Sequence, residues 1–120
     1  MRYTDLRVAG KAAEEATREK VGTHADEIET SMVLYMQPGV VRMDKAVADG
    51  LVVRPGPLTR DPANEKGHYA PSGVFGDATL ASWRKGQVVV EAQVADILKD
   101  LDALAGEPIP PGEPASPLGR

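Results

Sequence analysis

The sequence predicts a mostly helical chain that ends in one long helix. Apolar side chains recur at helical spacing over residues 24–36 and again over residues 78–105. Such a stripe is typical of a helix that packs one face against a core. Prolines and glycines interrupt residues 54–73 between these two stretches, so any strand there must be short.

Composition narrows the possible functions. The chain has 120 residues, which suits one domain or part of one, and a net charge of −4 without a basic cluster. These values argue against nucleic acid as the main partner. No apolar run approaches the roughly 20 residues that cross a bilayer, so we expect no membrane partner. The absence of cysteine excludes disulfides and thiolate metal sites and fits a cytoplasmic protein.

Two helices are expected in the first third of the chain. Residues 11–20 are rich in alanine and charged side chains and predict a short exposed helix, with Gly22 as its stop signal. Residues 24–36 predict the second helix, with Asp26 at a capping position. Its apolar stripe consists of Ile28, Met32, Tyr35 and Met36.

The middle of the chain is less regular. Val40, Met43 and Val47 have helical spacing and predict a short helix over residues 40–47, and residues 51–53 predict a short buried strand. The long irregular segment 54–73 could be a binding lid, an oligomer contact or a solvated connector.

The long C-terminal helix is expected over residues 78–105. Asp77 is placed to cap it, and Gly86 inside it predicts a close approach to a neighbouring backbone. We expect its apolar stripe to face a core; the stripe consists of Trp83, Val90, Val94, Ile97, Leu101 and Leu104. Gly106 should end the helix, and the proline-rich residues 107–120 predict a disordered tail after a domain of residues 1–106.

Polar side chains gather where the helix over residues 24–36 begins. In one interpretation Asp26 caps the helix and the nearby glutamates cover its surface. In the other, His24 and Glu29 line an active site, because side chains at a helix mouth can be directed at a ligand.

Two motifs resemble segments of the creatininase (creatinine amidohydrolase) family. The first, His24-Ala25 followed by Glu29-Thr30-Ser31, is similar to the family pattern His-Ala-Gly-x-x-Glu-Thr-Ser. The second is similar to Ser-Gly-Val-x-Gly-Asp-x-x-x-Ala-x-x-x-Lys-Gly; its matching residues are Ser72, Gly73, Val74, Gly76, Asp77, Ala81, Lys85 and Gly86. Their order and separation also match, and the resemblance spans about residues 20–105.

This resemblance implies an α/β chain, the C-terminal part of a layered α/β/α fold. It also implies a hydrolase of C–N bonds in cyclic or linear amides that depends on a divalent metal such as zinc, manganese or iron. By resemblance, His24 is a catalytic residue that contacts the substrate and shuttles a proton, a role that suits an imidazole. Glu29 is likewise catalytic, as an outer partner of the metal centre or as a metal ligand.

The chain departs from the family pattern in two ways. Asp26 stands where the family has glycine, and the Glu-x-His-Gly-x-His-Leu-Pro and Asn-Gly-His segments that carry the main metal ligands are not in this sequence. We therefore expect a portion of an amidohydrolase that is inactive without an N-terminal metal-binding half, or that works within a homo-oligomer. The alternatives are a non-catalytic assembly module and a ligand-binding regulator built around residues 54–73.

Overall fold

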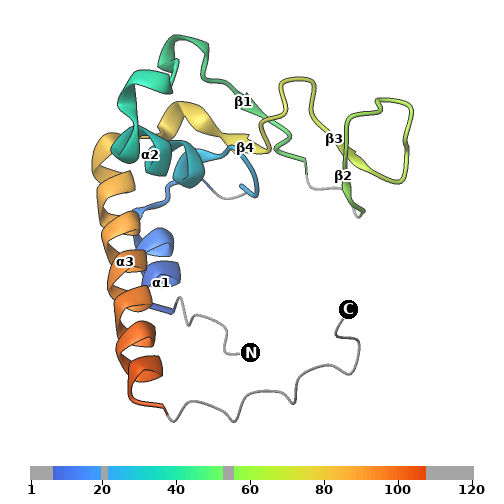
Figure 1. Cartoon of the computed structure of the whole chain (residues 1–120). Helices are drawn as coiled ribbons and strands as arrows, with labels where there is room; N and C mark the ends of the chain where they lie inside the picture. Colours follow the sequence, from blue (N-terminus) through green and yellow to red (C-terminus); the bar gives the residue numbers. More distant parts are fainter. Residues whose placement is uncertain (1–6, 20–21, 53–55, 108–120) are drawn as a thin grey trace, which may run out of the picture.

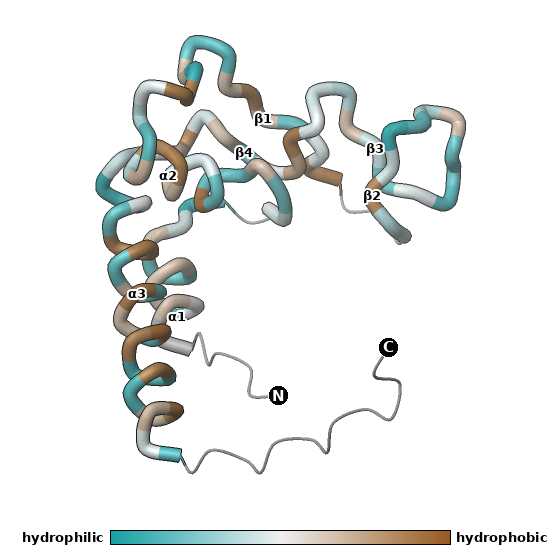
Figure 2. Tube along the Cα trace, in the orientation of Figure 1, coloured by the Kyte–Doolittle hydropathy of each residue, from teal (hydrophilic) through white to brown (hydrophobic). Residues whose placement is uncertain are grey.

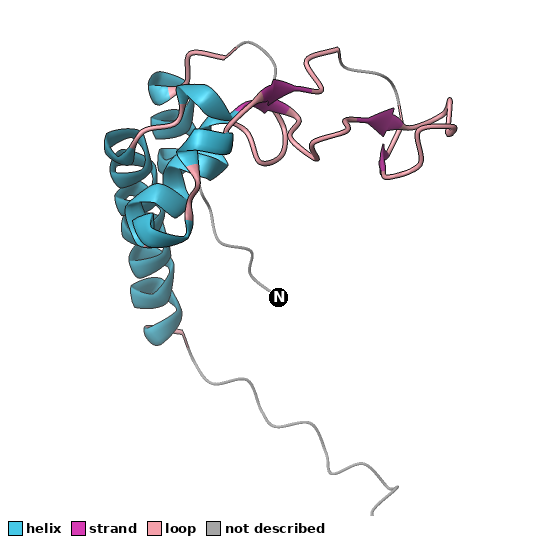
Figure 3. Ribbon diagram, turned by 90° about the horizontal axis from the view of Figure 1, so that it is seen from above, coloured by secondary structure: helices cyan, strands magenta, loops and turns pink. Residues whose placement is uncertain are grey.

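Three helices gather on one side of the molecule, and short strands and loops lie on the other. The computed structural model describes residues 7–19, 22–52 and 56–107. Helix α3 (Trp83–Ala105) is the longest element, and both α1 (Arg7–Ala16) and α2 (Glu27–Met36) pack against it. Figure 1 shows α1 beside α3 and α2 near its N-terminal end. Figure 3 shows the helices clustered apart from the strands.

Helix α1 begins and ends earlier than its alanine-rich sequence predicts. It covers Arg7–Ala16 instead of residues 11–20, so Gly22 does not end it. The backbone N–H groups of Arg18 and Glu19 leave the helical pattern and donate to the carboxylate of Glu27, at 2.7 and 2.9 Å. A tertiary contact therefore ends the helix, and local sequence preference does not reveal it.

The cap predicted for helix α2 is confirmed, but the face that the helix buries differs from the predicted one. Asp26 is the N-cap, and its Oδ1 accepts from the N–H groups of Ile28 and Glu29 at 3.0 and 2.9 Å. The face that is fully buried carries Glu27 and Ser31 instead of the predicted apolar stripe. The stripe is only partly covered, because Ile28, Met32 and Tyr35 are half-buried and Met36 is exposed.

Two 3-10 turns replace the helix predicted over residues 40–47. They are η1 (Pro38–Val40) and η2 (Met43–Lys45). Val40 is 64% exposed and Val47 is 39% exposed, so no core lies beneath this segment to stabilise a continuous helix. Isolated short helices are only marginally stable in water.

The strands are two residues long and form two pairs. β1 (Ala48–Asp49) pairs antiparallel with β4 (Gly76–Asp77), and β2 (Leu58–Thr59) pairs parallel with β3 (His68–Tyr69). The last pair gives residues 56–73 more order than their sequence suggests.

The buried strand predicted over residues 51–53 is wrong for its described part. Leu51 and Val52 form no strand, and Val52 is 73% exposed; residue 53 lies outside the described residues. Gly50, with φ +59°, turns the chain immediately after β1. A Cβ there would lie 2.9 Å from the carbonyl oxygen of Val74, so glycine is required at this turn.

Helix α3 starts five residues later than predicted. Its N-cap is Ser82, whose Oγ accepts from the N–H of Lys85 at 3.3 Å. Asp77 caps the preceding 3-10 turn η3 (Ala78–Leu80) instead, where its carboxylate accepts from the N–H of Thr79 at 3.0 Å. Gly106 follows the last helical residue, as predicted.

Most of the predicted apolar stripe of α3 is exposed. The buried positions of the helix are Gly86, Val89 and Asp96, which lie against α2 and α1. We call six of the exposed apolar side chains of this helix the apolar band; they are Trp83, Val94, Ile97, Leu98, Leu101 and Leu104. In Figure 2 the tube of α3 carries brown, hydrophobic residues along its length. The stripe was expected to face a core, but α1 and α2 occupy a different face of the helix.

The interior of the described chain is small and unusually polar. Its buried side chains comprise five apolar ones (Ala9, Ala70, Phe75, Ala78, Val89) and five polar ones (Asp26, Glu27, Ser31, His68, Asp96). Helices with two small sheets are compatible with a fragment of an α/β fold. Among the described residues, no helix has the length and hydrophobicity needed to span a membrane. The tail predicted over 107–120 lies, apart from its first residue, outside the described residues.

Candidate active site

A buried carboxylate joins α1, α2 and α3. The side chain of Glu27 is fully buried, with 0% exposure. Its Oε2 accepts from Thr17 Oγ1, from the N–H of Arg18 and from the N–H of Glu19, at 2.9, 2.7 and 2.9 Å. Its Oε1 forms an ion pair with Lys85 Nζ. Both oxygens of the carboxylate thus face donors, which is what a buried charge requires.

The contacts in this cluster shift the pKa values of two carboxyl groups in opposite directions. Burial alone would raise the pKa of Glu27, but the hydrogen bonds from Lys85 and from the backbone outweigh it, so the pKa is lowered. Burial raises the pKa of neighbouring Glu19. Glu19 is itself engaged, because its two oxygens accept from the N–H groups of Glu27 and Asp77 at 3.1 and 2.6 Å. Both carboxylates therefore hold the fold together.

Contacts between Ser31 and the start of α3 bring the two helices close together. Ser31 Oγ donates to the carbonyl of Glu27 at 2.6 Å and accepts from the N–H of Ser82 at 2.9 Å. A Cβ on Gly86 would collide with the carbonyl of Ser31 and lie 2.9 Å from Tyr35 Cβ. The close approach predicted at Gly86 is confirmed, and Ser31, Lys85 and Gly86 serve the packing of α2 on α3.

His24 lies just before α2 and is fixed through its backbone. Its carbonyl accepts from the N–H of Phe75 at 2.9 Å, and the carbonyl of Phe75 accepts from the N–H of Thr23 at 2.8 Å. Ala25 follows with φ +48°, a left-handed conformation that is uncommon for residues other than glycine. This turn separates the exposed His24 from the helix.

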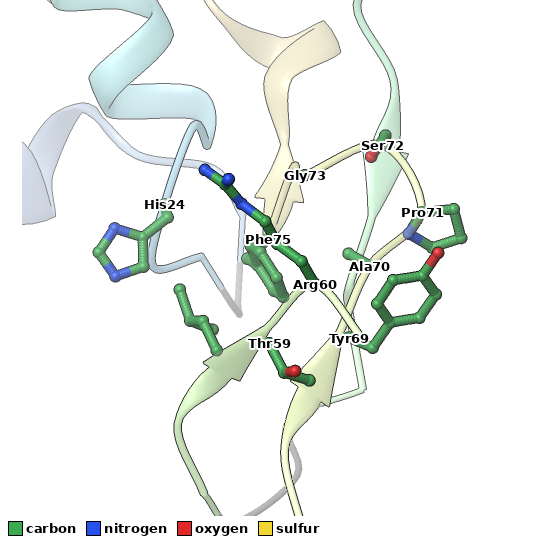
Figure 4. A pocket seen from close by; sticks show the side chains of 10 residues that line it. His24, Thr59, Arg60, Tyr69, Ala70, Pro71, Ser72, Gly73 and Phe75 are labelled. Carbon is green, nitrogen blue, oxygen red and sulfur yellow. The ribbon is translucent and has the colours of Figure 1, made fainter. Parts of the chain in front are cut away.

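The His24 side chain borders a surface hollow of about 510 Å³, which we call the His24 hollow. Its walls come from the turn before α2, from strands β2 and β3, from the residue after β2 and from the segment between β3 and β4. They consist of His24, Leu58, Thr59, Arg60, Tyr69, Ala70, Pro71, Ser72, Gly73 and Phe75. Figure 4 shows His24 on one side of the hollow and Tyr69 and Pro71 on the other.

Two contacts fix the segment between β3 and β4 that lines the hollow. The Asp49 carboxylate accepts from the hydroxyl and the N–H of Ser72, at 2.7 and 3.1 Å. These bonds from Ser72 lower the pKa of Asp49. Phe75 packs edge-to-face on His68, with ring centroids 4.8 Å apart. The hollow is therefore a built feature of the fold.

Glu29 lies on the other side of the turn at Ala25. Its Oε2 accepts from the N–H of Ala25 at 2.7 Å, and the side chain is exposed. Glu29 does not belong to the walls of the His24 hollow. In this conformation its carboxylate stabilises the helix mouth.

Comparison with known proteins identifies the family. The family model of creatininase, described as creatinine amidohydrolase, matches residues 1–101. The chain belongs to the creatininase family. Comparisons with curated proteins and with solved structures gave no significant match. The creatininase match supports a hydrolase function of the amidohydrolase type.

The described part of this creatininase-family chain does not by itself form a metal site. Across residues 7–19, 22–52 and 56–107, no three His, Asp or Glu side chains cluster in a way that could hold a metal ion. His24 and Glu29 are separated by the Ala25 turn, and Glu29 is engaged by a backbone N–H.

Sequence reasoning missed three residues that matter in this creatininase-family chain. Glu27 and Lys85 form the buried pair, although both types are usually exposed and their separation of 58 residues gives no local signal. Arg60 lies in the irregular segment 54–73, where nothing in the sequence distinguishes it from the other polar residues. The β2–β3 pairing that brings it to the same hollow as His24 follows no periodic pattern.

Proposed function

We propose that this chain carries one part of an amide-hydrolysing site, with His24 and Glu29 as its functional residues. A second polypeptide completes the site by supplying the metal ligands. The main support is the creatininase family match together with the position of His24 at a built hollow.

The chemistry assigned to His24 is proton transfer to the amide nitrogen as the C–N bond breaks. An imidazole can accept and donate a proton near neutral pH, and a general acid must lie within hydrogen-bonding reach of the leaving group. The backbone bonds to Phe75 fix the position of His24, and its exposed ring remains accessible. A hollow of about 510 Å³ is within the usual range for small-molecule sites, which suits a small cyclic or linear amide.

Glu29 is assigned a place beside the metal centre that the second polypeptide would form. Its carboxylate now accepts from one backbone N–H, and a rotation of the exposed side chain would free it. In the complete site it would orient a ligand or coordinate the metal directly.

An activity assay tests this proposal. The purified chain with added manganese or zinc should not hydrolyse creatinine. Turnover should appear when a polypeptide carrying the family segment Glu-x-His-Gly-x-His-Leu-Pro is added. In that mixture His24→Gln should reduce turnover by about 10²–10⁴-fold, the usual contribution of general acid–base catalysis.

The control is Lys66→Gln, an exposed charge outside the His24 hollow, which should leave turnover unchanged. The Glu29→Gln variant should lose activity and retain the melting temperature of the parent. Hydrolysis by the chain alone would show that no second polypeptide is needed. Full activity of both the His24 and Glu29 variants would refute their assignment.

The apolar band of α3 supports a second candidate function, that of an assembly module. From Val90 to Leu104 the apolar residues step by 4, 3, 4 and 3 positions, the spacing of a coiled-coil seam. Arg84 lies near the start of α3 and Asp102 near its end. Two antiparallel copies would place these opposite charges near each other, so we propose a second copy of this chain as the occupant of the band.

Sedimentation tests the assembly function. The wild-type chain should form dimers at micromolar concentrations, and Leu101→Asp should make it monomeric because a charge would enter the seam. Lys99→Asp changes an exposed residue two positions away on the same helix and should preserve the dimer. A wild-type chain that stays monomeric at all concentrations would rule out self-assembly through this band.

A further inference from the structure

The walls of the His24 hollow carry hydrogen-bond donors, among them the guanidinium of Arg60, but no carboxylate. Arg60, His24, Tyr69 and Thr59 are among its ten lining residues, which include neither aspartate nor glutamate. This contrasts with the chain as a whole, which has 18 acidic and 14 basic residues. The neighbouring hollow between α1 and α2 is acidic; its lining includes Glu14, Glu19 and Asp26.

Arg60 is anchored at the edge of the hollow. It directly follows β2, whose Leu58 and Thr59 pair with β3, and the hydroxyl of Thr59 accepts from the N–H of Asp61 at 3.1 Å. The backbone is therefore held on both sides of Arg60. Figure 4 shows the Arg60 side chain extending from β2 toward the side of the hollow where His24 lies.

The guanidinium of Arg60 is available to a ligand. The ion pairs between described residues join Lys11 to Glu15, Arg42 to Asp44 and Lys85 to Glu27, and none of them uses Arg60. A guanidinium offers a planar pair of N–H donors that matches the two oxygens of a carboxylate. A hollow with such a donor and no competing acid favours an anionic ligand.

We propose that the His24 hollow binds an amide substrate that also carries a carboxylate, with Arg60 as the partner of that carboxylate. This inference rests on the proposed function and names its substrate class, of which the N-acyl amino acids are the simplest members. Arg60 holds the carboxylate, so the amide nitrogen lies toward the imidazole of His24. Hydrolysis breaks the C–N bond, adds the OH of one water molecule to the carbonyl carbon and the remaining hydrogen to the nitrogen. It therefore generates an amine and a second carboxylate, which must be distinguished from the first.

Binding to the full chain tests this assignment without requiring turnover. Nitrogen-15 NMR of the Arg60 and His24 side chains would be followed during titration with three probes. N-acetylglycine carries both groups, N-acetylglycinamide replaces the carboxylate with an amide, and acetate represents the product carboxylate alone. N-acetylglycine should bind saturably and at least about tenfold more tightly than the other two, as expected for a charge-assisted pair added to the contacts of the amide.

Variants assign the effect to one side chain. Arg60→Gln should weaken N-acetylglycine binding by about tenfold and leave N-acetylglycinamide unaffected, and Arg60→Lys should lose less because it keeps the charge. Lys66→Gln removes a cation from the same segment outside the hollow and should change nothing. Both positions are exposed, so the variants should melt like the parent.

Three results would overturn the proposal. The first is equal binding of N-acetylglycine and N-acetylglycinamide, or no saturable binding of either. The second is an equal loss in Arg60→Gln and Lys66→Gln, which would indicate general charge attraction. The third is acetate binding as tightly as N-acetylglycine, which would assign Arg60 to the product. If Arg60 binds the carboxylate as expected while His24→Gln leaves turnover intact, only the proposed function fails.

Discussion

The Lys85→Met variant is expected to lose about 3 kcal/mol of unfolding free energy, the usual cost of breaking a buried ion pair. Lys85 Nζ donates to the Glu27 carboxylate and to the carbonyl of Leu80, and Glu27 is fully buried. Methionine fills similar space but leaves the carboxylate without its cation. Urea unfolding followed by circular dichroism would measure the loss.

Matched variants distinguish the contribution of the Glu27–Lys85 ion pair from the general effect of replacing a lysine in α3. Lys99→Met changes an exposed lysine of the same helix and should shift the unfolding free energy by less than about 0.5 kcal/mol. Glu27→Gln combined with Lys85→Met should be more stable than Lys85→Met alone, because the unpaired charge is gone. Equal stability of the Lys85 and Lys99 variants would show that the pair contributes little.

Acid unfolding provides a second measure of how much the ion pair between Glu27 and Lys85 stabilises the fold. The pKa of Glu27 is below its ordinary value of 4.5 in the fold, so its contribution is present above that pH and is lost as the pH falls through the lowered pKa. The raised pKa of Glu19 has the opposite effect on stability, which it increases as the pH falls. Glu27→Gln should therefore make stability less sensitive to acid.

The Gly86→Ala variant should also be strongly destabilised, by about 2–3 kcal/mol, as overpacking usually costs. The added methyl group would collide with the carbonyl of Ser31 and press on Tyr35, and backbone atoms cannot move aside as a flexible side chain can. Alanine would otherwise stabilise a helix interior by about 1 kcal/mol over glycine. Thermal melts monitored at the helix band would show the change.

Gly10→Ala is the matched control for this variant. Gly10 is an exposed residue of α1, and a Cβ there meets nothing within 4 Å. The same substitution should therefore raise stability by up to about 1 kcal/mol. Similar effects of the two alanines, in either direction, would mean that α2 and α3 are not in close contact at Gly86.

Helix caps, helix ends and close contacts could be predicted from the sequence where a single residue determines them. The Asp26 cap and the end of α3 before Gly106 follow from residues that act on the neighbouring backbone, and the close approach of α2 follows from the missing side chain of Gly86. The predicted end of α1 and the predicted start of α3 are wrong, because the Glu27 carboxylate withdraws N–H groups from the end of α1 and Ser82, not Asp77, caps α3.

Polar contacts between residues far apart in the chain could not be predicted from the sequence. A period of apolar residues predicts which face of a helix could be buried, but α2 buries Glu27 and Ser31, and the stripe of α3 remains largely exposed. For the site, the motifs pointed to His24 and to the family. The position of Arg60 in the wall of the His24 hollow depends on the pairing of β2 with β3, which no spacing along the chain encodes.

The small apolar interior has a thermodynamic consequence. Of the five buried apolar side chains in the described part of the chain, three are alanines, so unfolding hydrates little additional hydrocarbon. The heat-capacity increment of unfolding depends mainly on that hydration. Stability should therefore vary gently with temperature, and cooling should weaken this fold less than it weakens a domain with a large aliphatic core.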